Sequence, residues 1–291
     1  MTVTLRPRLT GLMRCDMKDA QITQDDLYAA RIFFNSALPL LKVVIQSKPK
    51  ILKKFEKKSF VFQVSALYDK APGGKMATHL VFDKGDITVK VSEIHPKPDI
   101  EFVFPDLKKF IIFFSGKGMP LPKMKGVVKN LGAFAAVMSG LLTMSKLLGS
   151  ENAPQDDGDK ELLVKLFFYL LPNGISQLNK AGHEGGGGGA LKSPDRAYAF
   201  AVTGYPELNS YIRVKEGDSK AGRGEYPRCK PFLTLRFDSV MHALDILLGK
   251  GDMVEYMAND YLRVEGAPEF AGVVGEFMFI IGDYAKAAYM G

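Results

Sequence analysis

An internal repeat is the feature that most constrains this chain of 291 residues. The segment DIEFVFPDLKKFIIFFSGKG, from Asp99, matches FLTLRFDSVMHALDILLGKG, from Phe232, at an offset of 133 residues. In both segments, apolar residues first alternate along the chain and then recur at helical spacing, which predicts a strand followed by a helix. The glycine that follows is expected at a helix C-terminus, because it enters the left-handed backbone region at no steric cost.

Further blocks repeat in the same order around this one. The apolar run RIFFNSALPLL resembles VKLFFYLLPNG, and FVFQVSA, from Phe60, resembles YAFAVTG, from Tyr198. Downstream, KMKGVVKNLGAFAAVMSGLL matches RVEGAPEFAGVVGEFMFIIG at an offset of 140 residues. We therefore predict a duplication, with a first domain at 1–150 and a second at 151–291. Each is expected to contain a helix, about three strands, a helix, a short strand and a final helix.

Charge is distributed unevenly between the two halves. Residues 1–150 carry 24 Lys and Arg against 12 Asp and Glu, whereas residues 151–291 carry 15 against 20. This difference favours an interaction surface on the basic first half, or attraction between the halves. The N-terminus is polar, the longest apolar runs are shorter than the roughly 20 residues that span a bilayer, and only Cys15 and Cys229 are present. These features predict a cytoplasmic protein without a disulfide framework.

Sequence signatures of catalysis and metal binding are weak. The four histidines, His79, His95, His183 and His242, lack the spacing of metal ligands. The run Gly185–Gly189 lacks the preceding strand and following helix of a nucleotide-binding motif, and is typical of a mobile loop or a lid. No groove-reading motif with stacking aromatic residues is visible. We therefore expect no metal, no cofactor and no nucleic acid partner.

The segment LTLRFDSVMHALDILLGKGDMVEYMANDYLRVEGAPEFAGVVGEF resembles the C-terminal half of the sterol carrier protein type 2 domain. That family shows an alternating apolar strand, an Asp or Ser that opens a helix, a Gly-Lys, a short helix, a strand and a long final helix. The first half resembles the same domain more weakly, because it keeps Ser115–Lys117 but lacks the short helix. In the second half the corresponding features are Leu233–Phe237, Asp238, Gly249-Lys250, Asp252–Met257, Tyr261–Gly266 and the segment from Phe270.

The resemblance implies an α+β fold in which each domain has a mostly antiparallel sheet of about five strands, covered by helices that enclose an apolar tunnel. It implies non-catalytic binding, and transfer, of a lipid or other apolar ligand such as a fatty acid, an acyl-CoA or a sterol. The 20 Phe and 13 Met agree with such a site, because Met adapts to irregular volumes. Two alternatives stay open: an enzyme or enzyme subunit acting on an acyl-CoA or other apolar substrate, and an assembly module.

Alternation along the strand and spacing along the helices predict which side chains face the ligand, with Thr234 and Arg236 pointing away. The segment Asp252–Asn259 has no counterpart in the first half, where Pro120 and Pro122 disfavour a helix. We therefore expect the better-formed tunnel in the second half and a smaller or collapsed cavity in the first. The predicted lipid-binding residues are Leu233, Leu235, Phe237, Val240, Leu244, Leu247, Met253, Met257, Val274, Phe277, Met278 and Ile281.

The basic run SKPKILKKFEKKS is predicted to contact a membrane. Its Lys53, Lys54, Lys57 and Lys58 would meet an anionic lipid surface, each contributing ~1 kcal/mol near the lipid. The alternative is a solvated helix face without a partner. The sequence leaves open the identity of the ligand and the oligomeric state.

Overall fold

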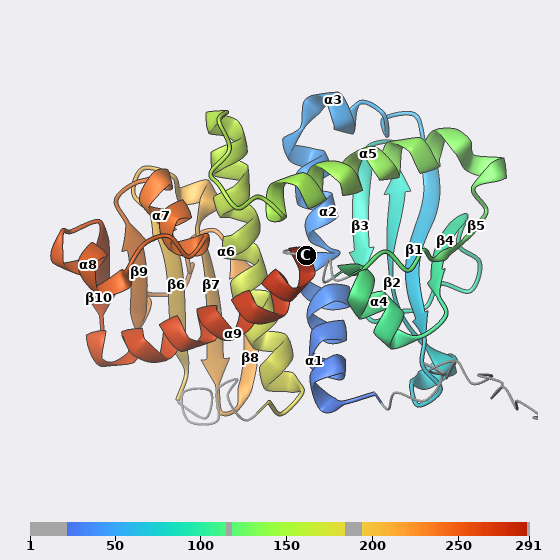
Figure 1. The fold of residues 1–291 in the computed structure, drawn as a ribbon. Helices are drawn as coiled ribbons and strands as arrows, with labels where there is room; N and C mark the ends of the chain where they lie inside the picture. Colours follow the sequence, from blue (N-terminus) through green and yellow to red (C-terminus); the bar gives the residue numbers. More distant parts are fainter. Residues whose placement is uncertain (1–21, 115–117, 184–193, 290–291) are drawn as a thin grey trace, which may run out of the picture.

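The computed structural model describes residues 22–114, 118–183 and 194–289, in which two five-stranded sheets flank a group of helices (Figure 1). Each half of the chain contributes one sheet. Within each sheet one strand pair is parallel and the other three are antiparallel. The predicted α+β class, with two mostly antiparallel sheets of five strands and flanking helices, is confirmed.

The first helix that the structure describes has two reciprocal hydrogen bonds at its N-terminus. Thr23 Oγ1 accepts a hydrogen bond from Asp26 N, and the Asp26 carboxylate accepts one from Thr23 N. The elements that follow in chain order are α1 (Gln24–Ile32), the π-helical turn η1 (Phe33–Ala37), α2 (Leu40–Ser47), α3 (Pro49–Leu52), β1 (Ser59–Leu67), η2 (Pro72–Gly74), β2 (Lys75–Asp83), β3 (Asp86–Lys90), β4 (Ile100–Phe104), α4 (Leu107–Phe114), β5 (Lys123–Lys125), η3 (Val128–Asn130) and α5 (Leu131–Leu148).

The second half begins with one long helix where the first half has three helical segments. Its N-cap is Asp156, whose carboxylate accepts a hydrogen bond from Asp159 N. The elements are α6 (Asp157–Lys180), β6 (Arg196–Val202), η6 (Pro206–Leu208), β7 (Ser210–Lys215), β8 (Asp218–Arg223), β9 (Leu233–Phe237), α7 (Val240–Leu247), α8 (Met253–Ala258), β10 (Leu262–Gly266), η7 (Pro268–Phe270) and α9 (Ala271–Tyr289).

The two sheets have the same connectivity. The strand orders are β3-β2-β1-β4-β5 and β8-β7-β6-β9-β10, so each strand of the first sheet has a counterpart in the second. Phe62 lies opposite Ile100 in the parallel pair of the first sheet, and Tyr198 lies opposite Leu233 in the second. Tyr198 therefore corresponds to Phe62, and the sequence match of Phe60 with Tyr198 was out of register by two residues. A two-residue shift keeps every side chain on the same face of the sheet, so the alternation could not reveal it.

Two glycines mark corresponding ends of the edge strands. Gly126 and Gly266 both adopt positive φ, at 76° and 102°. A Cβ atom at Gly126 would lie 1.8 Å from the carbonyl oxygen of Asp99, and one at Gly266 would lie 2.1 Å from that of Phe232. Both positions thus require glycine for backbone conformation and for space, and the same constraint recurs in both halves.

The first helices of the two halves lie side by side between the sheets (Figure 1). A single cluster of buried apolar side chains runs from one half into the other through these helices. Asn35 Nδ2 donates to Gln177 Oε1 at 3.0 Å, and Lys48 forms an ion pair with Asp159 across the same boundary. The halves are therefore joined by a continuous core as well as by the chain.

The second Gly-Lys-Gly ends a helix, as expected from the sequence. Gly249 follows α7 with φ of 73°, and the amides of Lys250 and Gly251 both donate to the carbonyl of Asp245. The first copy, at Gly116, and the run Gly185–Gly189 lie outside the described residues.

Two helical stretches are long and apolar enough to cross a bilayer, Gln24–Ser47 and Val128–Leu148. The share of the apolar window that is buried within the protein is 72% in the first and 39% in the second. Core helices of soluble proteins meet the same criterion of length and composition, so neither stretch is assigned to a membrane. These stretches were not identified from the sequence, because only uninterrupted apolar runs were considered there.

Candidate functional site

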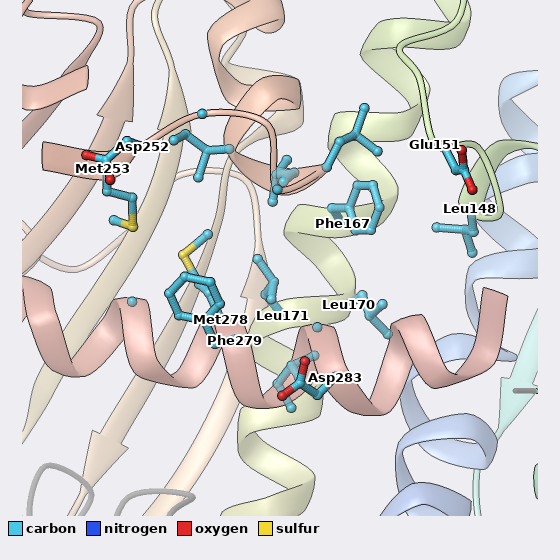
Figure 2. Close-up of a pocket in the computed structure, with 18 of the residues that line it drawn as sticks. Leu148, Glu151, Phe167, Leu170, Leu171, Asp252, Met253, Met278, Phe279 and Asp283 are labelled. Carbon is cyan, nitrogen blue, oxygen red and sulfur yellow. The ribbon is translucent and has the colours of Figure 1, made fainter. Parts of the chain in front are cut away.

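A cavity of about 370 Å³ lies in the helical layer of the second half, beside α6 and against the long helix α9 (Figure 2). Its walls come from α6, the end of α7, the start of α8 and α9, and its last wall is the end of α5 with the residues after it. The lining residues are Leu148, Ser150, Glu151, Phe167, Leu170, Leu171, Ile246, Leu247, Leu248, Gly249, Gly251, Asp252, Met253, Val254, Gly275, Met278, Phe279, Ile281, Gly282 and Asp283.

The α6 wall exists because this helix is apolar on more than one side. Phe168 is fully buried and contacts Phe200 and Phe237 of the sheet, with ring centroids 5.8 and 6.1 Å apart. The neighbouring Phe167 and Leu171 face the cavity instead. The apolar run of α6 from Leu166 to Leu171 therefore packs against the sheet on one side and faces the cavity on another.

The turn between α7 and α8 closes one end of the cavity. Asp252 caps α8, accepting hydrogen bonds from the amides of Val254 and Glu255 at 2.8 and 2.9 Å. Lys250 donates from Nζ to Asn152 Oδ1, which ties this turn to the segment that joins the halves. The cavity is therefore held in shape by contacts between residues that are far apart in sequence.

Of the twelve predicted lipid-binding residues, Leu247, Met253, Met278 and Ile281 line this cavity. The strand residues Leu233, Leu235 and Phe237 are fully buried and do not line it, and Phe237 packs against Phe168 of α6 instead. Among the rest, Met257 is 37% exposed at the surface. The remaining predicted residues that do not line the cavity are Val240, Leu244, Val274 and Phe277.

The two side chains expected to point away from the ligand lie on the other face of β9. Arg236 Nε donates to Glu265 Oε1 at 2.7 Å, and this pair is partly exposed. Thr234 is buried although it lies on the same face as Arg236. The alternation predicted for this strand thus agrees with the structure, while the cavity lies elsewhere.

The sequence reasoning missed the contributions of α6 and of the segment after α5. Phe167, Leu170 and Leu171 come from α6, and Leu148 and Glu151 come from the end of the first half and the segment after it. The uninterrupted apolar run of α6 from Leu166 to Leu171 was a usable signal for the first group. For the second group no sequence pattern exists, because it depends on how the two halves meet.

The wall of the cavity carries few polar groups. Most lining residues are apolar, and Ser150 Oγ already donates to the Asn152 carbonyl oxygen. No cluster of His, Cys, Asp and Glu that could hold a metal ion occurs within the described ranges. Among the lining residues there is no histidine, cysteine or lysine that could form a nucleophile–base pair with Ser150.

The corresponding positions of the first half carry aromatic side chains. At an offset of 133 residues, Leu166, Ala243, Ile246 and Leu247 of the second half correspond to Phe33, Phe110, Phe113 and Phe114. The ring centroids of Phe110 and Phe114 lie 4.7 Å apart, and those of Phe33 and Phe114 lie 5.5 Å apart. Larger side chains thus stand at these positions in the first half, and of their smaller counterparts Ile246 and Leu247 line the cavity of the second half.

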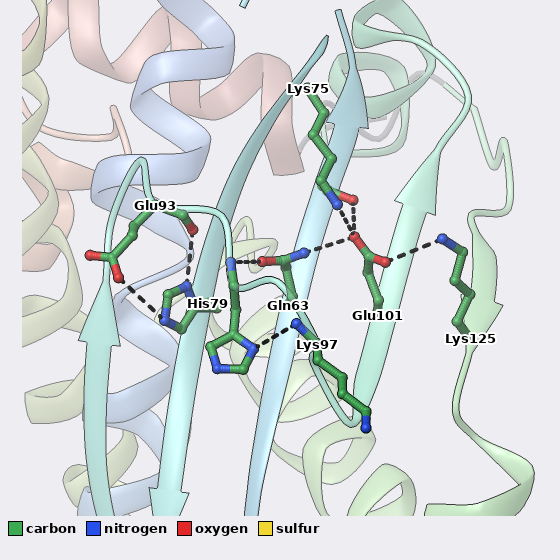
Figure 3. A network of polar contacts seen from close by, with 9 residues as sticks. Gln63, Lys75, His79, Glu93, Lys97, Glu101 and Lys125 are labelled. Atoms are coloured by element: carbon green, nitrogen blue, oxygen red, sulfur yellow. Dashed lines mark hydrogen bonds and ion pairs between the residues drawn. The ribbon is translucent and has the colours of Figure 1, made fainter. Parts of the chain in front are cut away.

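A polar network covers the outer face of the first sheet (Figure 3). Glu101 is 4% exposed, and its carboxylate accepts hydrogen bonds of 2.8 Å from each of Gln63, Ser65 and Lys75. Burial by itself raises the pKa of Glu101, but the hydrogen bonds from Lys75, Ser65 and Gln63 outweigh it and lower the pKa to about 2. Its polar atoms are satisfied within the protein, so we assign this network to stability.

The four lysines predicted to meet a membrane lie in a turn rather than on a helix, because α3 ends at Leu52. Lys53, Lys54 and Lys57 are exposed, and Lys58 Nζ donates to the carbonyl of Lys54 at 2.7 Å. Phe55, between them, is fully buried and stacks on Phe82. The run is therefore a turn with solvent-exposed lysines and not a helix face, and its contact with a membrane stays a prediction.

Exposed apolar side chains lie next to this basic turn. Val128, in η3, is 86% exposed, and Leu131, the first residue of α5, is 63% exposed. The side chain of Lys58 reaches this part of the helix, since its Cε lies 3.6 Å from where a Cβ of Gly132 would be. Basic and apolar groups thus share one surface of the first half.

Comparison with known proteins gives low similarities. No family model and no curated protein matches the chain. A conserved hypothetical protein of Thermus thermophilus, with a suggested identity as a sterol carrier protein, is similar at 15% identity and a TM-score of 0.27, over 40% of this chain and 84% of the other. A double mutant of the sec-alkyl sulfatase PisA1 is similar at 15% identity and a TM-score of 0.29, over 50% of this chain and 21% of the sulfatase. The inverting sec-alkylsulfatase Pisa1 of Pseudomonas sp. is similar at 13% identity and a TM-score of 0.24, over 46% and 29%.

Proposed function

We propose that this protein binds an apolar ligand, without catalysis, in the cavity between α6, α7, α8 and α9. The observation that supports the proposal is a cavity of about 370 Å³ with a mostly apolar wall. Its volume falls within the roughly 300–1,000 Å³ typical of small-molecule sites. The sequence resemblance to a lipid-binding family points to the same class of ligand.

Burial of a hydrocarbon chain supplies enough free energy for such binding. Each buried methylene contributes ~0.8 kcal/mol, so a chain of about twelve carbons gains on the order of 10 kcal/mol before costs. Association costs at least ~4 kcal/mol. The net gain is then at most about 6 kcal/mol, which corresponds to a dissociation constant of roughly tens of micromolar. A site of this kind needs few specific polar contacts, which explains why its residues form no sharp sequence motif.

A leucine at Gly282 tests where the ligand binds. Gly282 lines the cavity on α9, and a Cβ at this position would meet no atom within 4 Å. Gly282→Leu is therefore expected to fill the cavity without a clash and to raise helix propensity. The matched control is Gly272→Leu, on the same helix, where a Cβ also meets nothing within 4 Å and which does not line the cavity.

The measurement is displacement of a neutral fluorescent probe by dodecanol, together with native mass spectrometry of the purified protein. We expect Gly282→Leu to weaken binding at least tenfold, while Gly272→Leu binds as the wild type does. Equal binding by both variants would show that this cavity is not the site. An enzyme would instead turn the bound molecule over, and an assembly module would carry no co-purifying small molecule.

Transfer of a ligand between membranes requires a docking surface, and we propose that the basic turn at Lys53–Lys58 provides it. Its exposed lysines attract anionic lipid, and the neighbouring Val128 and Leu131 offer apolar groups to the interface. Together the two features support a carrier that binds its ligand in the second half and meets the membrane with the first.

A further inference from the structure

The ionisable groups around the cavity all have the same sign. Among the described residues that line it, Glu151, Asp252 and Asp283 are ionisable, and none is Lys, Arg or His. Figure 2 shows these three carboxylates on different sides of the apolar wall, at its two ends and on α9. A ligand that enters from solvent therefore meets negative charge at several points of the rim.

The backbone adds to this negative potential. Leu148 is the last residue of α5, and the residues from Ile246 to Gly249 form the end of α7, so two helix C-termini lie at the cavity. Helix C-termini carry a partial negative charge. The one helix that begins here, α8, has its first amides occupied by the carboxylate of Asp252, which offsets its partial positive charge.

Positive groups close to the cavity are directed elsewhere. Lys250 lies between two lining residues in the sequence, but its ammonium group is held by Asn152 and it does not line the cavity. The rings of Phe167 and Phe279 do line it, and the face of an aromatic ring attracts cations. Both observations favour a positively charged group at the rim over a negatively charged one.

We propose that the cavity selects amphiphiles whose polar end is positively charged or uncharged, such as long-chain amines or alcohols, and discriminates against fatty acids and acyl-CoA. This inference rests on the proposed function, because it assigns a ligand class to the same cavity. It also narrows the ligand class, since the anionic members of the class expected from the sequence are disfavoured by charge.

The test compares probes that share one hydrocarbon chain and differ in charge. Dodecyltrimethylammonium, dodecanol and dodecanoate are titrated below their micelle concentrations against the full-length protein, with displacement of a neutral fluorescent probe as the readout. We expect dodecyltrimethylammonium to bind most tightly. At low salt the dissociation constant of dodecanoate should be at least roughly tenfold higher than that of dodecanol, and this ratio should fall as salt is added.

Charge variants locate the source of the selectivity. The double variant Glu151→Gln/Asp283→Asn leaves the helix cap Asp252 in place. It is expected to reduce severalfold the ratio of the dissociation constant of dodecanoate to that of dodecyltrimethylammonium. The control Glu207→Gln/Glu276→Gln makes the same change in net charge at exposed residues that do not line the cavity. It should leave this ratio of dissociation constants unchanged.

The outcomes separate the two proposals. If no probe binds, or if binding of all three survives Gly282→Leu, the proposed function itself is wrong. If all three bind in the cavity with equal affinity, or dodecanoate binds most tightly, the proposed function stands and the charge selectivity is overturned.

Discussion

Replacing Glu101 with glutamine measures how much one buried carboxylate stabilises the first sheet. Glu101 is held at a pKa of about 2 in the folded protein, against an ordinary value of 4.5. That difference, at about 1.4 kcal/mol per pKa unit, corresponds to roughly 3 kcal/mol of folding free energy. Because the folded pKa is depressed, this contribution is fully present above pH 4.5 and is lost as the pH falls toward 2.

The assay is urea-induced unfolding of wild type and Glu101→Gln at pH 7 and at pH 3. We expect the wild type to be more stable by about 3 kcal/mol at pH 7 and by only about 1 kcal/mol at pH 3. Comparing the free energies of unfolding of the two proteins at each pH removes the contribution of all other carboxylates. A difference in this free energy that is the same at both pH values would refute the reasoning.

The control is Glu265→Gln in the second sheet. Glu265 also pairs with a cation, Arg236, and this interaction lowers its pKa, but its side chain is 33% exposed. An ion pair at this exposure contributes at most about 1 kcal/mol, because water screens it. If Glu265→Gln lowered the free energy of unfolding as much as Glu101→Gln does, burial would not set the strength of these interactions.

Two further predictions concern the basic turn and the edge strands. Replacing Lys53, Lys54, Lys57 and Lys58 with glutamine should weaken binding to anionic vesicles, measured by sedimentation, by ~1 kcal/mol per lysine in contact with lipid. Dodecanol binding should stay unchanged. Vesicle binding equal to that of the wild type would show that the turn is not part of the docking surface. Gly266→Ala should lower the free energy of unfolding by several kcal/mol, because its Cβ would lie 2.1 Å from a carbonyl oxygen. Gly217→Ala, also at positive φ but with nothing within 4 Å of the Cβ, should cost only about 1–2 kcal/mol in the same urea titration, and equal losses would argue against the clash.

The order of the elements could be predicted from the sequence because each strand and each helix carries its own apolar periodicity. The strand at Leu233–Phe237 was expected at those bounds, and the short helix expected at Asp252–Met257 runs over Met253–Ala258. The missing short helix of the first half also agrees with the structure, which has no helix between Gly118 and Lys123. In each case the signal lies within a few consecutive residues.

The position of the cavity could not be predicted in this way. The strand residues Leu233, Leu235 and Phe237 have the pattern of a ligand-facing strand, but the same pattern serves a strand that is covered by a helix. The sequence shows that a side chain is buried, and it does not show whether a helix or a ligand buries it. Leu148 and Glu151 reach the cavity only through the packing of the two halves, a contact between distant segments that leaves no periodic trace.

The shared core has a consequence for how this chain can be handled and how it can have diverged. Each half places its first helix against the other half, so a fragment ending near residue 150 would expose to water the apolar side chains with which α1, η1 and α2 contact α6. Such a fragment would be expected to dimerise or aggregate. A single unit of this kind could cover the same helix by pairing with an identical copy of itself, whereas within one chain the two sides of that contact are free to differ. They do differ here, because the aromatic cluster of Phe33, Phe110 and Phe114 stands where the second half has Leu166, Ala243 and Leu247.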